Sequence, residues 1–151
     1  MFRKPVLPFL LGVGLVAITA LAASGGDEAA TPPGTESGLL AGVYTAEQAD
    51  RGEAVITGHC ASCHGATLTG GQFGGPPLRG SFFFDRWAGK TLEELYVFVR
   101  LNMPAGRPNS LTAQQYIDSI AFILETNEFP AGEEELPPDR ETLAQLEIVA
   151  P

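Results

Sequence analysis

The sequence predicts an all-α domain of short helices joined by loops rich in glycine and proline. Three segments combine N-cap residues with apolar side chains at helical spacing, and no alternating strand pattern extends beyond a few residues. The 151 residues include 18 Gly and 12 Pro, which is typical of long irregular connections. We therefore expect three to four short helices in one domain, since about 100–200 residues is the usual domain size.

The helices are expected at three places along the chain. Residues 45–57 open with a Thr-x-Glu turn and continue with the apolar pair Val55 and Ile56. Residues 91–100 begin with a Thr cap and an acidic first turn, followed by apolar side chains at helical spacing. The third helix is expected to start after Thr112, which has a Gln three residues later, and to run to about Asn127.

Residues 1–23 have the features of an export segment. Arg3 and Lys4 precede an apolar stretch at residues 5–23, no acidic residue occurs before Asp27, and residues 20–22 offer small side chains at a cleavage site. Two outcomes stay open: removal as a signal peptide, or retention as a membrane anchor, because the apolar length is near the lower limit of about 17 residues for a span. We expect a periplasmic or other extracytoplasmic protein, free or tethered to the inner membrane.

The composition of the flanking segments separates them from the central domain. Residues 24–43 consist largely of Gly, Pro, Ser, Thr and acids, which predicts a flexible linker. Residues 130–151 form an acidic C-terminal extension, in which Leu143 and Leu146 can face inward from a short amphipathic turn that either folds back or binds a partner. The net charge of −9 argues against nucleic acid as a partner, because backbone binding needs excess cation.

The sequence Cys60-Ala61-Ser62-Cys63-His64 has the C-x-x-C-H spacing of covalent c-type haem attachment. Cysteines three residues apart on one helical turn can each add to a haem vinyl group, and the histidine extends to the iron. A thioredoxin-like pair would need a strand before the first Cys, where a helix is expected instead. A zinc site would need further ligands, and only His59 is nearby. We predict one covalently attached haem c with its iron.

Met103 is the candidate for the second axial ligand of the iron. It is the only Met beyond Met1, and His59 cannot easily reach the opposite face of the ring because Cys60 fixes its neighbour on the His64 side. Pro and Gly residues after Met103 predict a non-helical loop. His/Met ligation gives a closed coordination sphere, which favours electron transfer over oxygen chemistry.

Residues from about Tyr44 to Phe129 resemble class I monohaem cytochromes c. The matching features are the small and bulky residues of the first helix, a G-P-x-L motif, the distal loop and the last helix: Gly52, Ile56, residues 75–78, Met103-Pro104 and residues 116–123. The resemblance implies a cytochrome c fold in which the Pro76 carbonyl accepts a hydrogen bond from His64, Leu78 packs on the haem, and Phe122 packs against Gly52. The implied haem-binding set is Cys60, Cys63, His64, Pro76, Leu78 and Met103, with His64 and Met103 on the metal and no catalytic residue.

Aromatic side chains are the candidates for the remaining shell of the haem. We expect the run Phe82-Phe83-Phe84 to fold over the ring edge, and Trp87 and Arg79 are candidate donors to the haem propionates. For each aromatic side chain taken singly, a place in the ordinary hydrophobic core is the alternative. The wider aromatic set is Phe73, Phe82, Phe83, Phe84, Trp87, Tyr96 and Phe98.

These observations predict a periplasmic c-type cytochrome that passes single electrons between a redox donor and acceptor, and is itself an electron carrier rather than an enzyme. Two alternatives stay open: a subunit of a larger dehydrogenase or oxidase, and a haem sensor or peroxidase-type enzyme with an open sixth position. Residues 127–137 resemble the tails of cytochromes c that serve quinoprotein dehydrogenases, apart from the acidic triplet at residues 133–135. Candidate partners are a quinoprotein dehydrogenase, a quinol–cytochrome c reductase or a terminal oxidase, with membrane contact through residues 5–23.

Overall fold

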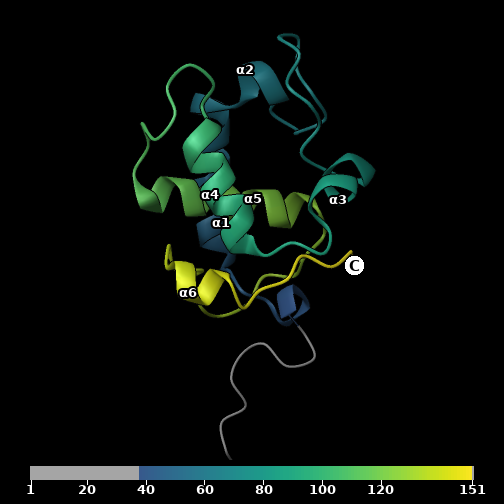
Figure 1. The fold of residues 1–151 in the computed structure, drawn as a ribbon, viewed down its shortest axis with the longest axis vertical. Helices are drawn as coiled ribbons and strands as arrows, with labels where there is room; N and C mark the ends of the chain where they lie inside the picture. Colours follow the sequence, from purple (N-terminus) through teal and green to yellow (C-terminus); the bar gives the residue numbers. More distant parts are fainter. Residues whose placement is uncertain (1–37, 151) are drawn as a thin grey trace, which may run out of the picture. The chain divides into compact units, whose positions relative to one another are not determined.

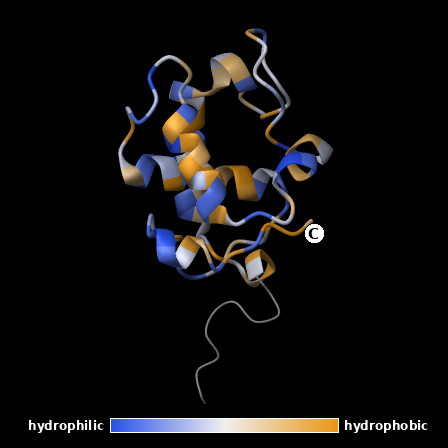
Figure 2. Ribbon diagram, in the orientation of Figure 1, coloured by the Kyte–Doolittle hydropathy of each residue, from blue (hydrophilic) through white to orange (hydrophobic). Residues whose placement is uncertain are grey.

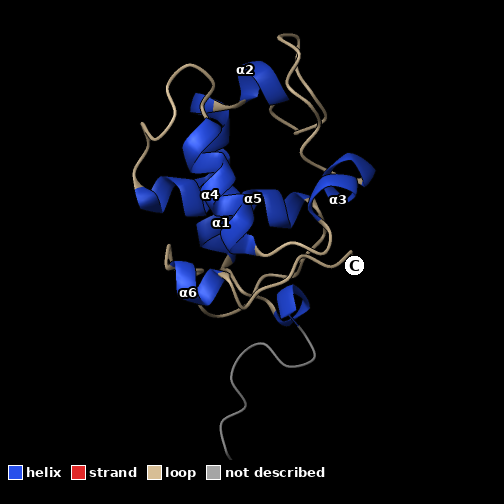
Figure 3. Ribbon diagram, in the orientation of Figure 1, coloured by secondary structure: helices blue, strands red, loops and turns tan. Residues whose placement is uncertain are grey.

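The computed structural model of the chain describes residues 38–150 (Figure 1). The export segment predicted at residues 1–23 and most of the predicted linker lie outside these residues. Within residues 38–150 the structure is helical and has no strand, only an isolated antiparallel bridge between Thr91 and Glu147 (Figure 3). The all-α prediction is therefore confirmed. The elements in chain order are η1 (Gly38–Ala41), α1 (Ala46–His59), α2 (Ala61–His64), α3 (Ser81–Trp87), α4 (Leu92–Asn102), α5 (Ala113–Thr126) and α6 (Arg140–Leu143).

The three long helices begin where the sequence predicts them. Thr45 caps α1 by accepting a hydrogen bond from the backbone N–H three residues later. Thr91 and Thr112 open α4 and α5 with complete capping boxes, in which an N3 side chain bonds back to the cap. Each cap satisfies backbone donors that a helix start leaves free. No helix among the described residues is long and apolar enough to cross a membrane.

The crossing of α1 over α5 is the main helix contact of the structure. A Cβ added to Gly52 would lie 2.0 Å from the carbonyl oxygen of Asp118 and 2.9 Å from the Cβ of Phe122. Only glycine lets the two backbones approach this closely. The predicted packing of Phe122 against Gly52 is confirmed. Figure 2 shows hydrophobic residues concentrated along α4 and α5, which lie in the centre of the domain.

The short helices account for the difference from the predicted three to four. α2 continues from the end of α1 as a single turn, α6 lies in the C-terminal segment, and α3 contains the run Phe82-Phe83-Phe84, for which the sequence predicted no helix. α3 begins after Gly80 without a side-chain cap. It buries Phe83 and Trp87 on one side and leaves Phe82 exposed.

The two terminal segments pack together below the crossing (Figure 1). Leu39 of η1 is fully buried, and Gly42 and Gly132 approach so closely that a Cβ on Gly132 would lie 2.0 Å from the Gly42 oxygen. The predicted linker of residues 24–43 is therefore wrong at its end, because the apolar Leu39 side chain ties residues 38–43 to the core. Residues 130–150 fold back on the domain and bury Leu136, Leu143, Leu146 and Ile148.

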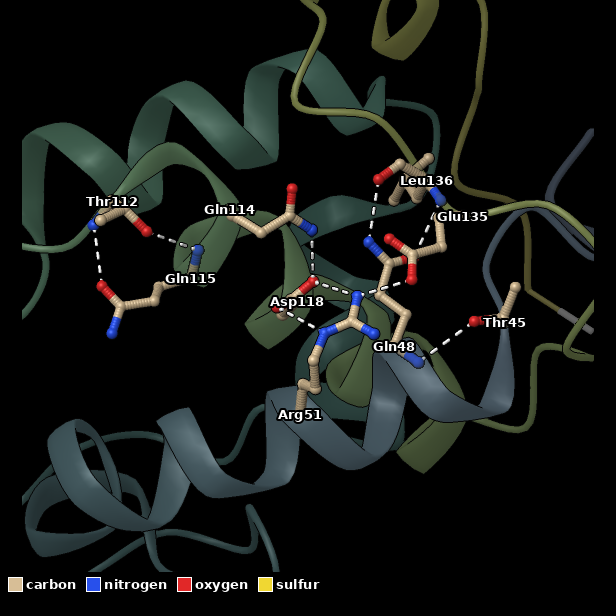
Figure 4. Close-up of polar contacts among 9 residues, drawn as sticks. All are labelled: Thr45, Gln48, Arg51, Thr112, Gln114, Gln115, Asp118, Glu135 and Leu136. Atoms are coloured by element: carbon tan, nitrogen blue, oxygen red, sulfur yellow. Dashed lines mark hydrogen bonds and ion pairs between the residues drawn. The ribbon is translucent and has the colours of Figure 1, made fainter.

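Polar contacts also hold the C-terminal segment against α1 (Figure 4). The buried Gln48 amide donates to the Leu136 carbonyl at 2.9 Å and accepts from the Leu136 N–H at 2.8 Å. The Arg51 guanidinium contacts Asp118 of α5 at 3.2 Å and Glu135 at 2.8 Å. One helix face is thereby joined to both α5 and the C-terminal segment.

Candidate functional site

A cavity of about 840 Å³ lies among α1 to α5 and the loops at residues 65–80 and 103–107. Its size is typical of a small-molecule or cofactor site, which spans roughly 300–1,000 Å³. Its wall, called the cavity wall below, contains every residue that the sequence singled out for haem binding: Cys60, Cys63, His64, Pro76, Leu78 and Met103.

The two cysteines are presented by the turn that joins α1 to α2. The Cys60 N–H closes α1 on the Ile56 carbonyl at 2.9 Å, and the Cys60 carbonyl accepts from the N–H groups of Cys63 and His64 at 3.0 and 2.9 Å. Both thiols are free and partly buried, and they fit a CXXCH site. Burial, and secondarily the neighbouring Cys63, raises the pKa of the Cys60 thiol to about 11. The unmodified thiol is thus protonated at neutral pH.

The His64 ring is oriented by a backbone carbonyl. Its side chain is buried, and Nδ1 lies 2.8 Å from the Pro76 oxygen. Because a carbonyl can only accept, Nδ1 must donate, which leaves the lone pair on Nε2 for a metal. Such a hydrogen bond fixes both the tautomer and the ring plane of a ligating histidine.

The loop at residues 65–80 folds tightly onto the cysteine turn. A Cβ on Gly71 or Gly75 would lie 2.4 or 2.3 Å from the Cys63 oxygen, so both positions require glycine. The buried Asn127 side chain accepts from the Gly80 N–H and donates to the Leu78 carbonyl, each at 2.9 Å. Sequence analysis missed this role of Asn127, for which a polar residue at a helix end is the only local signal.

Met103 lies at the C-terminus of α4, and its backbone is fixed on both sides. Its N–H donates to the Val99 carbonyl and its carbonyl accepts from the Tyr116 hydroxyl, both at 2.8 Å. The following loop is non-helical, as the sequence predicts. Tyr116 comes from α5, so the central helix holds the backbone that presents the Met103 side chain to the cavity. The sequence indicated Tyr116 only as part of a helix.

Five of the seven aromatic candidates lie on the cavity wall. The cavity wall contains Phe73, Phe82, Phe83, Trp87 and Phe98, whereas Phe84 and Tyr96 do not line it. Phe84 packs against Phe83 and Phe129 instead, with ring centroids 5.4 and 6.1 Å apart. The prediction that Phe84 folds over the ring edge is therefore wrong.

Arg79 is also placed away from the cavity wall. It lines a separate hollow of about 330 Å³, together with Phe84 and Asn127. Gly80 starts α3 directly after it, and the helix turns toward the cavity only from Phe82 onward. Of the two suggested propionate donors, Trp87 therefore lies on the cavity wall and Arg79 does not.

The residues of the cavity fit a haem in their chemistry. Two thiols on one turn, an imidazole with a free Nε2, a thioether and a mostly aromatic and aliphatic wall are the groups that a covalently bound, axially ligated macrocycle needs. An all-helical domain with this donor set has the fold and site of a c-type cytochrome.

Comparison with protein families agrees with this class. The sequence model of the family described as "Cytochrome C oxidase, cbb3-type, subunit III" matches residues 47–123, just over half of the chain. The chain belongs to this family. It is a c-type cytochrome domain that holds covalently bound haem c with its iron and acts as an electron carrier.

One solved structure is also similar to the chain. It is the sulfane dehydrogenase SoxCD from Paracoccus pantotrophus, with 26% identity, coverage of 92% of this chain and 68% of that chain, and a TM-score of 0.48. No curated protein matches the chain significantly.

Proposed function

We propose that this domain transfers single electrons between redox proteins outside the cytoplasm, through a haem whose iron is ligated by His64 and Met103. The observation that carries the proposal is the 2.8 Å contact between His64 Nδ1 and the Pro76 oxygen, on a cavity wall that also contains Met103. When bound, the haem supplies one-electron chemistry at an iron that alternates between the ferric and ferrous states.

In this proposal the protein holds the two ligands on the iron and keeps other ligands from replacing them. Pro76 keeps the His64 proton on Nδ1, and Cys60 and Cys63 attach the cofactor by thioether bonds. Leu78 provides apolar surface beside His64. A stable thioether ligand leaves the iron without an open position, which suits electron transfer better than ligand binding.

The position of Met103 supports its role as the second ligand. Its backbone is held from α4 through Val99 and from α5 through Tyr116, so its approach to the cavity is defined by two helices. No other Met lies among the described residues. His59 also lines the cavity, but it directly precedes Cys60, whose thioether bond would keep it on the His64 side of the haem.

The extracytoplasmic location rests on the sequence of residues 1–23. Two basic residues and an apolar stretch precede a Gly-, Pro- and acid-rich segment, which is the order found in exported or anchored proteins. The donor and acceptor are then redox proteins on the same side of the membrane. N-terminal sequencing of the mature protein distinguishes a cleaved signal from an anchor.

A second candidate function is that of an electron-carrying subunit in a larger oxidoreductase. The family description, which names subunit III of a cbb3-type cytochrome c oxidase, favours it. Purification of the native protein at low detergent concentration, without crosslinking, tests this candidate. Stable co-purification with a dehydrogenase or oxidase supports a subunit, and recovery as a monomer supports a diffusing carrier.

Replacement of Met103 tests the proposed ligation. In haem-loaded protein, Met103→Ala should abolish the methionine-to-iron charge-transfer band and allow imidazole or carbon monoxide to bind readily. Leu101→Ala is the matched control, because Leu101 is 65% exposed and does not line the cavity. Ready ligand binding by the unmodified protein, or a band that survives in Met103→Ala, would overturn His/Met ligation.

A further inference from the structure

The Pro76 carbonyl that orients His64 lies in a stretch of backbone without donors of its own. Pro76 and Pro77 are consecutive prolines, and neither has a backbone N–H. This stretch cannot fix itself by donating hydrogen bonds, so its position has to come from the residues on either side. The 2.8 Å contact between the Pro76 oxygen and His64 Nδ1 therefore depends on how those neighbours are held.

Contact with the cysteine turn fixes the residue before the two prolines. A Cβ on Gly75 would lie 2.3 Å from the Cys63 oxygen, so the loop backbone lies directly against that turn. Earlier in the same loop, the Gly70 N–H donates to the His64 carbonyl at 2.8 Å. On this side the loop is held by the segment that carries the cysteines and His64.

Leu78 is the first residue after the prolines with a backbone N–H, and both of its polar backbone groups are held. The N–H donates at 2.8 Å to the carbonyl of Leu68, whose side chain is fully buried. The carbonyl accepts from the Asn127 amide at 2.9 Å. The same amide accepts from the N–H of Gly80, the cap of α3, also at 2.9 Å. On this side the loop is held by the end of α5.

The orientation of the Asn127 amide follows from the chemistry of its partners. The Gly80 N–H can only donate, so it faces the amide oxygen, whereas the carbonyls of Leu78 and Ile123 can only accept and face the amide NH₂ group. The Asn127 side chain is buried at the C-terminus of α5, the helix that packs on α1. Asn127 therefore joins the loop that carries Pro76 to the main helix pair of the domain.

We propose that Asn127 is a positioning residue for His64, which it does not touch. By holding the Leu78 carbonyl, it keeps the Pro76 carbonyl in place to accept from His64 Nδ1. A proton shared in this way makes a ligating imidazole more basic, and a more basic ligand favours the ferric form of the iron. Asn127 thereby lowers the reduction potential. The inference rests on the proposed ligation of the iron by His64 and is independent of Met103.

Asn127→Ser tests this role in haem-loaded protein. The serine hydroxyl can still donate to the Ile123 carbonyl four residues earlier, as serines in helices do, but it is too short to span Gly80 and Leu78. NMR of labelled histidine in the reduced protein should show the His64 Nδ1 proton exchanging with water about tenfold faster, because fewer buried hydrogen bonds oppose local opening of the loop. The equilibrium constant for reduction should rise about threefold, equivalent to about 28 mV for one electron.

Thr126→Val is the matched control at the same helix end. The Thr126 hydroxyl donates at 2.8 Å to the Phe122 carbonyl within α5, so its loss removes a hydrogen bond of the helix and none of the loop. It should leave the exchange rate and the potential unchanged. Asn127→Ala also removes the bond to Ile123 and should raise the potential at least as much as Asn127→Ser. All measurements are made well below the unfolding temperature of each variant.

The sign of the shift in potential separates this role from a merely structural one. A loop that only loosened around the haem would admit water, and water favours the more highly charged ferric form, so the potential would fall. A fall in Asn127→Ser, or an exchange rate and potential equal to those of the unmodified protein, would overturn the proposal. Equal shifts in Thr126→Val would overturn it as well.

The unmodified protein distinguishes this proposal from the proposed ligation. If its His64 ring signals lack the large shifts of a ring bound to haem iron, ligation by His64 is refuted, and this inference with it. If those shifts are present and Asn127→Ser leaves the exchange rate unchanged, only the role of Asn127 is refuted.

Discussion

The two halves of the described chain are built differently. We call α1, α5, residues 38–44 and residues 130–150 the base, and α2, α3 and the loops at residues 65–80 and 103–107 the cavity half. In the base, Gln48 and Leu39 are fully buried and the helices touch at Gly52. In the cavity half, Phe73 and Phe82 are 69% and 59% exposed. Substitutions in the base should therefore change folding, and those in the cavity half should change the cofactor's properties.

The strongest test of this contrast is Gly52→Ala. Its Cβ would collide with the Asp118 backbone, which cannot move without separating α1 from α5. We expect the free energy of unfolding to fall by about 3 kcal/mol, measured by urea titration. Gly58→Ala in the same helix is the control, because no atom lies within 4 Å of its Cβ, and it should gain about 0.5–1 kcal/mol. Equal effects of the two variants would show that the close approach of α1 and α5 is not the cause of the lost stability.

Gln48→Ala should have the next largest effect. It leaves the buried N–H and carbonyl of Leu136 without partners, which costs about 2 kcal/mol. The C-terminal segment should also become more accessible to limited proteolysis, while the visible spectrum stays unchanged. The exposed Gln145→Ala serves as the control. An altered haem spectrum in Gln48→Ala would argue against the independence of the two halves.

A pair of tyrosine variants compares a hydrogen bond from the base to the cavity half with one inside the base. Tyr116→Phe removes the hydroxyl that donates to the Met103 carbonyl, and Tyr44→Phe removes the one that donates to the Phe129 carbonyl in the base. Each should cost about 1 kcal/mol of stability. On heating, only Tyr116→Phe should lose the charge-transfer band before the protein unfolds. Early loss of the band in Tyr44→Phe as well would contradict the inference that the Tyr116 hydroxyl specifically holds Met103 in place.

The smallest expected effect concerns a surface carboxylate of the base. Burial, then the carboxylates of Asp50 and Glu53, raise the pKa of Glu125 above its ordinary value. The folded state then binds this proton more tightly, so the associated stability is present below the ordinary pKa and is lost as pH rises through the folded value. Glu125→Gln should raise the free energy of unfolding at pH 7 by about 0.3 kcal/mol.

The difference should vanish at about pH 3.5, where Glu is protonated in both states. Urea titrations at the two pH values measure it, with the exposed Glu134→Gln as the control. A gain that persists at low pH would have a cause other than ionisation.

Local sequence signals predicted the base and the residues that line the cavity well. Thr45, Thr91 and Thr112 each start a helix, because a hydroxyl that accepts a hydrogen bond two or three residues on is a local interaction. The spacing of the cysteines and His64 is equally local. Met103 could be predicted as a residue of the cavity because methionine is scarce, since the described chain has no other Met.

Features that depend on distant contacts could not be predicted in this way. The start of α3 has no cap, and its Phe run matches no helical pattern by itself, so the helix depends on burial of Phe83 and Trp87. Which arginine borders the cavity then depends on the direction of that helix. The contact of Gln48 with Leu136 joins residues 88 positions apart, and no neighbouring residue in the sequence indicates it.

The pairing of the terminal segments has a practical consequence for handling the protein. A Cβ on Gly38 would lie 3.9 Å from the Glu147 oxygen, so the first described residue lies beside the C-terminal segment. In Figure 1 this region is at the opposite end of the domain from α2, which carries Cys63. An electrode linker attached after the C-terminal segment would therefore leave the end of the domain that carries α2 free for electrical contact.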